Sequence, residues 1–347
     1  MWSLLANRMT QIRLFDIRDV SLVQRLSPLG RPLAYEPIAV HGLNPLREAM
    51  RAYVSAGYDR TVALTCREPD THGLDAFGLM YIVPGRSNGR GDAPCAALLF
   101  MAPTPQSNEL TDIWAELSEA FVAFAGEHGV QCIVAETPEE GNEAEALHRV
   151  GFSPLMHQDI MKLSLLPEEM VPADVIGLRA LEDHDDSYVK LLSMRVVPKL
   201  VQKAEGNTDL TRLTHHTDCG YIFIRNQEPM AHISLHQGRR GYGMQLMFRP
   251  EAEDVAEATL LYALSNLCGK SRRPVYCMVP SYQSWLLPIL DNLGFTHITS
   301  NAIMVKHTTK RLRQPIWSVQ TSHANTKLIV KSDTKLRFQR ARIRRNP

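Results

Sequence analysis

The sequence lacks the patterns typical of secreted, membrane-spanning or zinc-binding proteins. Its six cysteines form no CxxC pair, and most lie among apolar residues, which favours buried, reduced thiols over disulfides or a metal site. No apolar run approaches the roughly 18 residues that a membrane span needs. The apolar stretch Trp2–Ala6 is too short for a signal peptide and follows no basic residues. We therefore expect a cytoplasmic protein with no metal ion and no membrane partner.

The net charge is also close to zero, but the charged residues are unevenly distributed along the chain. The 347 residues carry a formal net charge of +1, yet residues 308–347 hold eleven Lys and Arg against one acid, Asp333. That segment therefore carries +10 and the preceding residues −9. Basic residues interleaved with Trp317 and Phe338 are typical of segments that bind RNA or another polyanion. The alternative is a weakly ordered tail that docks on the acidic body of its own chain or a neighbour's.

The strongest positive feature is an internal duplication. At a shift of 143 positions, apolar residues and glycine fall on like residues: Leu117, Gly151, Phe152 and Met161 on Leu260, Gly294, Phe295 and Met304. At a shift of 166, Arg13 and Asp19 fall on Arg179 and Asp185. These matches predict two copies of one supersecondary plan.

Length supports the same division, because 347 residues exceed what a single core usually serves. We predict a first copy at 9–165, a proline-containing linker at 166–174, a second copy at 175–307 and a basic tail at 308–347. In the first copy we expect strands at 12–18, 61–66, 78–83, 96–101, 130–135 and 158–163, with helices near 20–26, 45–57, 111–128 and 143–150. In the second we expect strands at 176–179, 221–225, 230–236, 243–248, 275–279 and 302–306, with helices at 253–267 and 285–293.

In both copies a helix and a strand precede a short helix that ends in Gly-Phe, and one last strand follows. This order resembles the GCN5-related N-acetyltransferase (GNAT) superfamily. The resemblance implies an α/β fold class with a mixed sheet, here a tandem duplicated acyl-CoA N-acyltransferase-like fold. It also implies acetyl-CoA or another acyl-CoA as cofactor, bound in a splay between the fourth and fifth strands. The acceptor would be an amine of a small molecule or a protein.

Both copies depart from the family's motifs. The pyrophosphate motif Gln/Arg-x-x-Gly-x-Gly/Ala would fall at Ala102–Leu110 and at Arg249–Val255, and neither segment contains glycine. The first has two prolines, which donate no N–H, and the second has three carboxylates, which would repel a pyrophosphate. The tyrosine that serves the family as general acid is replaced by Leu147 and Leu290.

The first copy is the better candidate for a coenzyme site. Its candidate cofactor-binding residues flank the end of the fourth strand and the next helix N-terminus, where an anion could bind: Phe100, Ala102, Thr104, Ser107 and Asn108. Glu136, at the end of the fifth strand, is the candidate general base, and His148 is one residue from the missing tyrosine. For both, we favour the alternative of a solvated surface role.

Two further motifs have simpler interpretations. The sequence Gly238–Gly243 looks like a phosphate loop, but it precedes the fourth strand of the second copy, which favours a hairpin turn. His232 and His236 would share one strand face without a third metal ligand, which favours surface or hydrogen-bonded histidines. The sequence thus leaves three functions open: an acyltransferase, a catalytically silent tandem protein that binds a ligand or partner, and an RNA-binding protein that works through 308–347.

Overall fold

The computed structural model describes residues 11–55, 60–67, 75–83, 94–139, 141–165, 175–205, 219–267 and 273–308. The described residues all belong to one compact unit, which ends at residue 310. The predicted linker and nearly all of the basic tail lie outside the described residues. Within those residues, no helix combines the length and apolarity needed to cross a bilayer.

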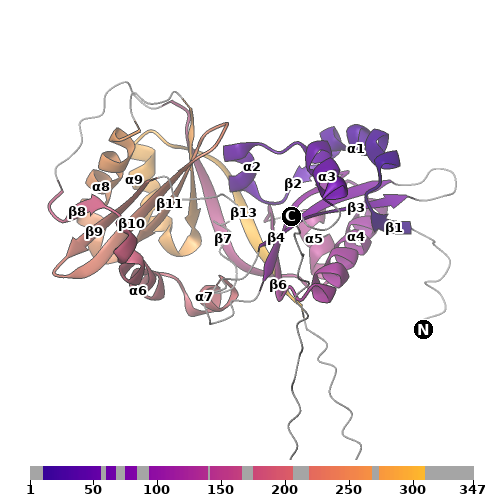
Figure 1. Ribbon diagram of the computed structural model, residues 1–347. Coiled ribbons are helices and arrows are strands. Elements are labelled where there is room, and N and C mark those ends of the chain that lie inside the picture. Colours follow the sequence, from indigo (N-terminus) through magenta and orange to yellow (C-terminus); the bar gives the residue numbers. More distant parts are fainter. Residues whose placement is uncertain are drawn as a thin grey trace, which may run out of the picture. The chain divides into compact units, whose positions relative to one another are not determined.

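The predicted order of elements is confirmed in both copies (Figure 1). The first copy contains β1 (Gln11–Leu14), α1 (Val20–Leu26), β2 (Arg31–Pro32), α2 (Tyr35–His41), α3 (Pro45–Val54), β3 (Thr61–Arg67), β4 (Ala76–Val83), β5 (Cys95–Ala102), α4 (Asn108–Glu127), β6 (Cys132–Pro138), α5 (Asn142–Arg149) and β7 (Ser153–Leu163). The second contains β8 (Leu178–Ala180), α6 (Asp186–Val196), α7 (Lys199–Glu205), β9 (Cys219–Arg225), β10 (Glu228–Gln237), β11 (Tyr242–Phe248), α8 (Glu253–Ser265), β12 (Val275–Pro280), α9 (Leu287–Asn292) and β13 (Thr296–His307). The sequence did not predict β2, α2, α6 and α7.

All strands belong to one mixed sheet, in the order β1-β3-β4-β5-β6-β13-β7-β12-β11-β10-β9-β8, with β2 paired to β5. The last strands are exchanged: β13 of the second copy lies between β6 and β7, and β7 of the first copy pairs with β12. The pairs β5–β6 and β11–β12 are parallel, whereas the other pairs are antiparallel. Each copy therefore completes the other's sheet, and the boundary between 9–165 and 175–307 stays a prediction.

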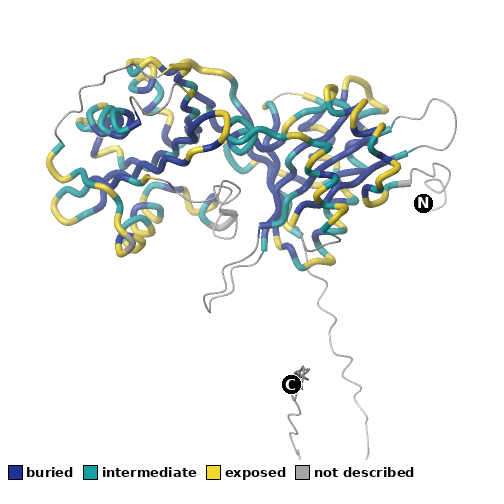
Figure 2. The backbone as a smooth tube through the Cα atoms, turned by 45° about the horizontal axis from the view of Figure 1, so that its top comes forward, coloured by how far each residue is buried: buried dark blue, intermediate teal, exposed yellow. Residues whose placement is uncertain are grey.

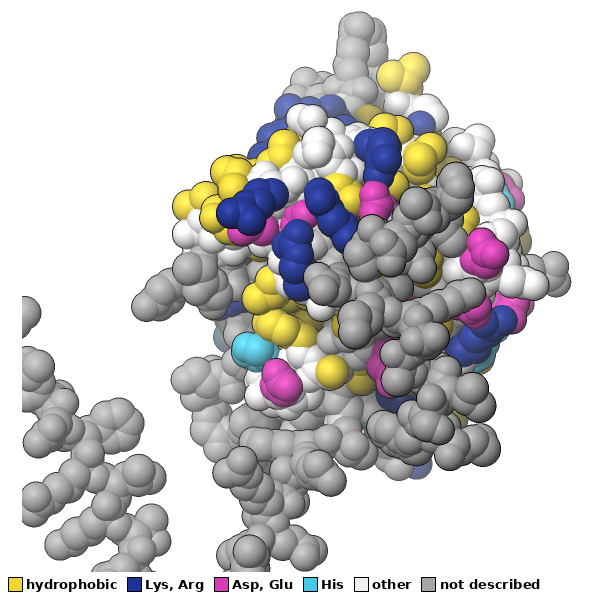
Figure 3. Space-filling model, turned by 90° about the vertical axis from the view of Figure 1, so that its right-hand side faces the viewer, with side chains coloured by type: hydrophobic (Ala, Val, Ile, Leu, Met, Phe, Trp, Pro, Cys, Tyr) yellow, Lys and Arg dark blue, Asp and Glu magenta, His cyan; other side chains and the backbone are white. Residues whose placement is uncertain are grey.

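The two copies begin with the same ion pair. Arg13 donates two hydrogen bonds of 2.8 Å to Asp19, and Arg179 donates two of 2.6 and 2.7 Å to Asp185. Both aspartates are fully covered, and each also accepts a backbone N–H three residues earlier, which fixes the turn into the following helix. Figure 3 faces the β1 end of the sheet, where arginine and lysine side chains lie beside acidic ones.

The Gly-Phe pairs close the last helix of each copy. Gly151 and Gly294 adopt φ values of +89° and +87°, which glycine reaches without strain. The next N–H, of Phe152 or Phe295, then bonds back to the carbonyl of Leu147 or Leu290 at 3.0 Å. Both phenylalanine side chains are buried in the cores beneath the helices. In Figure 2 the buried backbone follows the strands of each copy.

Candidate active site

The fourth and fifth strands separate in both copies, as the resemblance implies. β5 and β6 pair only from Cys95 with Cys132 to Ala97 with Val134. β11 and β12 pair only from Tyr242 with Val275 to Met244 with Cys277. Beyond these positions each pair diverges, which creates two slots in the sheet.

The backbone of Leu33 fills the first slot. Its N–H donates to the carbonyl oxygen of Leu99 on β5 over 2.9 Å, and its carbonyl accepts the N–H of Glu136 on β6 over 2.8 Å. The preceding residues Arg31 and Pro32 pair with β5 as β2. Leu33 is 1% exposed. Residues 31–33 therefore bridge the two strands where the resemblance places the coenzyme.

The residues just before this segment, Leu29 and Gly30, contact three of the predicted cofactor-binding residues. Phe100 is buried against Gly30, where an added Cβ would lie 2.1 Å from the Phe100 ring. Ala102 is also fully buried. Thr104 donates both its N–H and its hydroxyl to the carbonyl of Leu29, over 2.8 and 2.9 Å. Both hydrogen-bond donors of Thr104, one of the residues expected to hold an anion, are therefore engaged by the chain itself.

The remaining two predicted cofactor residues lie at the start of α4. Ser107 is the N-cap, and its hydroxyl accepts the N–H of Leu110 over 3.4 Å. Asn108, the first residue of the helix, is exposed. The assignment of Phe100, Ala102, Thr104, Ser107 and Asn108 to a coenzyme stays a prediction.

Glu136 lies beside the filled slot and is only 8% exposed, so the surface alternative is wrong for this residue. Its carboxylate accepts the backbone N–H of Tyr35 over 3.0 Å. Burial raises the pKa of Glu136 to about 7, and the nearby charge of Glu36 adds to the rise. Hydrogen bonds from Tyr35, Asn301 and Gln158 act in the opposite direction. A buried carboxyl that titrates near neutrality could exchange a proton with a bound molecule.

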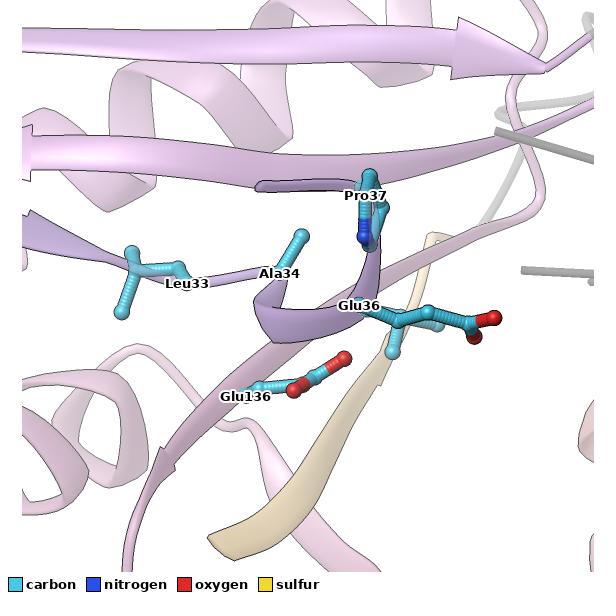
Figure 4. A pocket seen from close by; sticks show the side chains of 7 residues that line it. Leu33, Ala34, Glu36, Pro37 and Glu136 are labelled. Carbon is cyan, nitrogen blue, oxygen red and sulfur yellow. The ribbon is translucent and has the colours of Figure 1, made fainter. Parts of the chain in front are cut away.

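The cavity next to Glu136 is small. It has a volume of about 20 Å³ and is lined by Leu33, Ala34, Glu36, Pro37, Ala97, Val134 and Glu136. Figure 4 shows the Glu36 side chain extending from the first turn of α2 away from Glu136. This volume accommodates about one water molecule. An acyl group therefore does not fit beside Glu136 in this arrangement.

His148 does not join Glu136. It is exposed on α5, and its Nδ1 lies 3.1 Å from the carbonyl oxygen of Phe152. Leu147, at the position of the family's tyrosine, is fully buried in the core. The structure thus brings no second proton-transfer group of the sequence prediction to the first slot, and a catalytic role of His148 stays a prediction.

A side chain fills the second slot. The carboxamide of Gln283 accepts the N–H of Phe248 over 2.9 Å and donates to the carbonyl of Leu246 over 3.0 Å. Gln283 is 1% exposed. It lies in a 3-10 turn at Ser281–Leu286, directly after β12. The sequence prediction missed both Leu33 and Gln283, because neither belongs to a motif that signals its partner.

A buried polar network joins α2 to the second copy. Glu36 lies 2.6 Å from Nε2 of His236 on β10, and Gln245 on β11 donates to both Glu36 oxygens over 3.2 and 3.3 Å. The rings of Tyr35 and Tyr276 meet edge to face at 6.4 Å. The helix that follows Leu33 therefore contacts the second copy, and His236 is buried at 4% exposure, so the surface alternative is wrong for this histidine.

Further titratable groups in the described part of the chain include the histidines of β10. His232, on the same strand face, is buried, and burial lowers its pKa to about 4. Among the described residues, no three His, Cys, Asp or Glu side chains gather as metal ligands. Asp159, His297 and Ser300 are in contact, but Nε2 of His297 lies near both partners. A nucleophile relay instead needs the serine and the carboxylate on different ring nitrogens.

No family model and no curated protein matches the sequence. Solved structures do match. A GCN5-related N-acetyltransferase from Sphaerobacter thermophilus superposes with a TM-score of 0.52 at 12% identity, covering 86% of this chain and 95% of that one. The chain has the GNAT fold.

Two other GNAT structures are similar over the same share of this chain. A tandem GNAT protein from the clavulanic acid biosynthesis pathway has a TM-score of 0.44 at 13% identity and is covered to 98%. A GCN5-related N-acetyltransferase from Anabaena variabilis has a TM-score of 0.41 at 10% identity and is covered to 73%. Identities this low speak only to the fold, so the function must be argued from the slots themselves.

Proposed function

We propose that this chain is a tandem GNAT-fold binding protein that does not transfer acyl groups. The observation that carries the proposal is the position of Leu33, whose backbone bridges β5 and β6 in the first slot. In the second slot, the Gln283 carboxamide hydrogen-bonds two backbone groups of β11. An acyl-CoA bound in the manner of the family would have to displace one of them.

Displacement from the first slot is costly. It breaks two backbone hydrogen bonds and exposes a buried leucine, which together cost about 3 to 6 kcal/mol. That cost lowers coenzyme affinity by about two to four orders of magnitude. The segment is also held at both ends, because Thr104 binds Leu29 before it and Glu36 binds His236 after it. The filled slot therefore favours a protein that has exchanged its coenzyme site for internal contacts.

One observation favours acyl transfer as a second candidate function. A carboxyl with a pKa near 7 suits a general base, and Glu136 lies at the point where the strands diverge. Acyl-CoA would be the cofactor and an amine the acceptor. This function requires residues 31–35 to leave the slot. The backbone N–H of Tyr35 is hydrogen-bonded to the Glu136 carboxylate, and the cavity beside it holds about one water.

The test is coenzyme binding and turnover by the full chain. We expect acetyl-CoA at millimolar concentration to leave the melting temperature unchanged and to release no free thiol in the presence of mixed amines. Glu136→Gln and His148→Gln serve as the paired variants. Thiol release that Glu136→Gln abolishes and His148→Gln preserves would establish the acyltransferase and overturn our proposal.

The composition of residues 308–347 carries a separate proposal, that this segment binds RNA. Its net charge of +10 supports phosphate contacts. Filter binding of a short single-stranded RNA should weaken steeply as salt increases and should disappear when the chain ends at His307. Binding that survives the truncation would assign RNA to another part of the protein.

A further inference from the structure

A second, larger cavity lies away from both slots. It has a volume of about 480 Å³ and is formed by α1, the turn between α2 and α3, and the Gly238–Gly241 turn between β10 and β11. Its lining includes Asn44, Arg47, Arg239 and Arg240 and no carboxylate of the described residues. The volume falls in the range of small-molecule sites, about 300 to 1,000 Å³.

Two of these arginines stand out by their lack of ion pairs. Arg239 and Arg240 are exposed at the turn, and within the described residues neither guanidinium has an acidic partner. Arginines elsewhere are paired, as Arg179 is with Asp185 and Arg249 is with Glu228. Two unpaired arginines on a body of net charge −9 make a local positive site in an acidic surround.

The turn that carries the arginines is fixed by backbone contacts. Arg240 donates its N–H to the carbonyl of Val40 over 2.8 Å, and Arg273 donates to the carbonyl of Gly238 over 2.8 Å. Gly42, with φ of +79°, allows the Arg240 side chain to lie against the backbone, because a Cβ there would meet Nε at 2.6 Å. The two guanidinium groups therefore start from a rigid platform.

The opposite wall adds a helix N-terminus. Asn44 caps α3, a helix of 10 residues, by accepting the N–H of Arg47 over 3.1 Å, and Pro45 is its first residue. Arg47 also lines the cavity, although Glu48 accepts two of its hydrogen bonds. The positive end of the helix dipole and the arginines thus face one space.

We propose that this cavity binds the phosphate group of a small organic phosphate. The arginine guanidinium matches phosphate through paired, parallel hydrogen bonds. A phosphate also has more acceptor oxygens than a carboxylate, so it can bind two arginines at once. The concave shape suits a compact ligand better than a polymer strand. The inference goes beyond the proposed function, because this cavity is distinct from both coenzyme slots.

Calorimetry on the full chain at low salt tests the site with ribose 5-phosphate and with ribose. We expect heat from the phosphate ester and none from ribose. The double substitution Arg239→Gln/Arg240→Gln should lower the affinity at least about tenfold, because charge-assisted bonds are lost. Arg18→Gln is the matched control, since the Arg18 side chain is 89% exposed and is not part of this lining. It should change the affinity by less than about twofold.

A second measurement needs no variant. Ribose 5-phosphate should protect Arg239 and Arg240 from modification by phenylglyoxal, read by mass spectrometry, and should leave Arg18 unprotected. The proposal fails if ribose 5-phosphate gives no heat and no protection, or if Arg18→Gln weakens binding as much as the double variant. RNA binding that the double variant abolishes, without ribose 5-phosphate binding, would also overturn it. Acetyl-CoA turnover beside intact phosphate binding would overturn only the proposed function.

Discussion

The N–H of Leu33 donates to the carbonyl of Leu99 over 2.9 Å, and this bond closes the gap between two diverging strands. The second copy closes the equivalent gap with the carboxamide of Gln283. A carboxamide offers the same donor and acceptor as a peptide group. Backbone N–H and C=O groups at a buried strand edge need hydrogen-bond partners. A slot that holds no ligand must therefore find those partners within the chain. Main chain in one copy and side chain in the other meet the same requirement.

Replacement of Gln283 should therefore destabilise the fold. Gln283→Ala leaves the N–H of Phe248 and the carbonyl of Leu246 unpaired in the interior. We expect a loss of about 2 to 4 kcal/mol in the free energy of unfolding, measured by urea denaturation. Gln131→Ala, at an exposed glutamine, is the control and should change stability by less than about 0.5 kcal/mol. Equal effects of the two substitutions would show that Gln283 does not hold the slot closed.

Glu136 should make stability depend on pH near neutrality. Its pKa is raised from 4.5 to about 7 in the folded chain, so the folded state holds a proton that the unfolded state releases. The stabilisation is present below about pH 4.5 and is lost as pH rises through 7. Wild type should lose about 1 kcal/mol more than Glu136→Gln between about pH 6 and 8. Parallel pH profiles of the two proteins would show that Glu136 is ionised throughout.

The sequence predicted what local patterns encode. The Gly-Phe helix ends, and the recurrence of Arg13 and Asp19 at Arg179 and Asp185, follow from shifting the sequence on itself. The structure adds that each Arg pairs with its Asp. The element order followed from apolar periodicity. These features fix the fold of each copy.

The exchange of strands could not be predicted in this way. β13 begins at Thr296, earlier than expected, and its polar first half pairs with β7 of the other copy. Glu136 is buried because Asn301 and Gln158, from the exchanged strands, cover it. Leu33 lies in a stretch without periodicity, and its partners are more than 60 residues away. Burial and slot closure here come from long-range pairing that no local pattern records.

The covered aspartates should carry part of the acid sensitivity of the fold. Hydrogen bonds from Arg179 lower the pKa of Asp185 from 3.8 to about 2, so its stabilisation is present above about pH 4 and is lost as pH falls towards 2. Asp185→Asn should lower stability at pH 7 by about 1 to 3 kcal/mol, measured by thermal or urea denaturation, and should flatten the acid limb. The neighbouring Asp186 is exposed, and Asp186→Asn should leave the stability at pH 7 and the acid limb nearly unchanged. An acid limb that Asp185→Asn does not alter would contradict the role of this pair.

Gly243 is required by the contact between the copies. Its φ is not in the left-handed region, but an added Cβ would lie 2.0 Å from Nε2 of His236 and 2.7 Å from Oε1 of Glu36. Because these two side chains are buried and lie 2.6 Å apart, they cannot move away from an added Cβ without disturbing the contact between α2 and β10. Gly243→Ala should therefore cost about 1 to 3 kcal/mol in urea denaturation.

Gly126→Ala is the matched control for this change. Gly126 lies in α4, and its added Cβ would meet no atom within 4 Å. Alanine in a helix should instead raise stability by about 0.5 to 1 kcal/mol. The two glycine substitutions are thus expected to have opposite signs. A neutral or stabilising Gly243→Ala would mean that His236 and Glu36 move freely, and the anchoring of the Leu33 segment by the second copy would have to be abandoned.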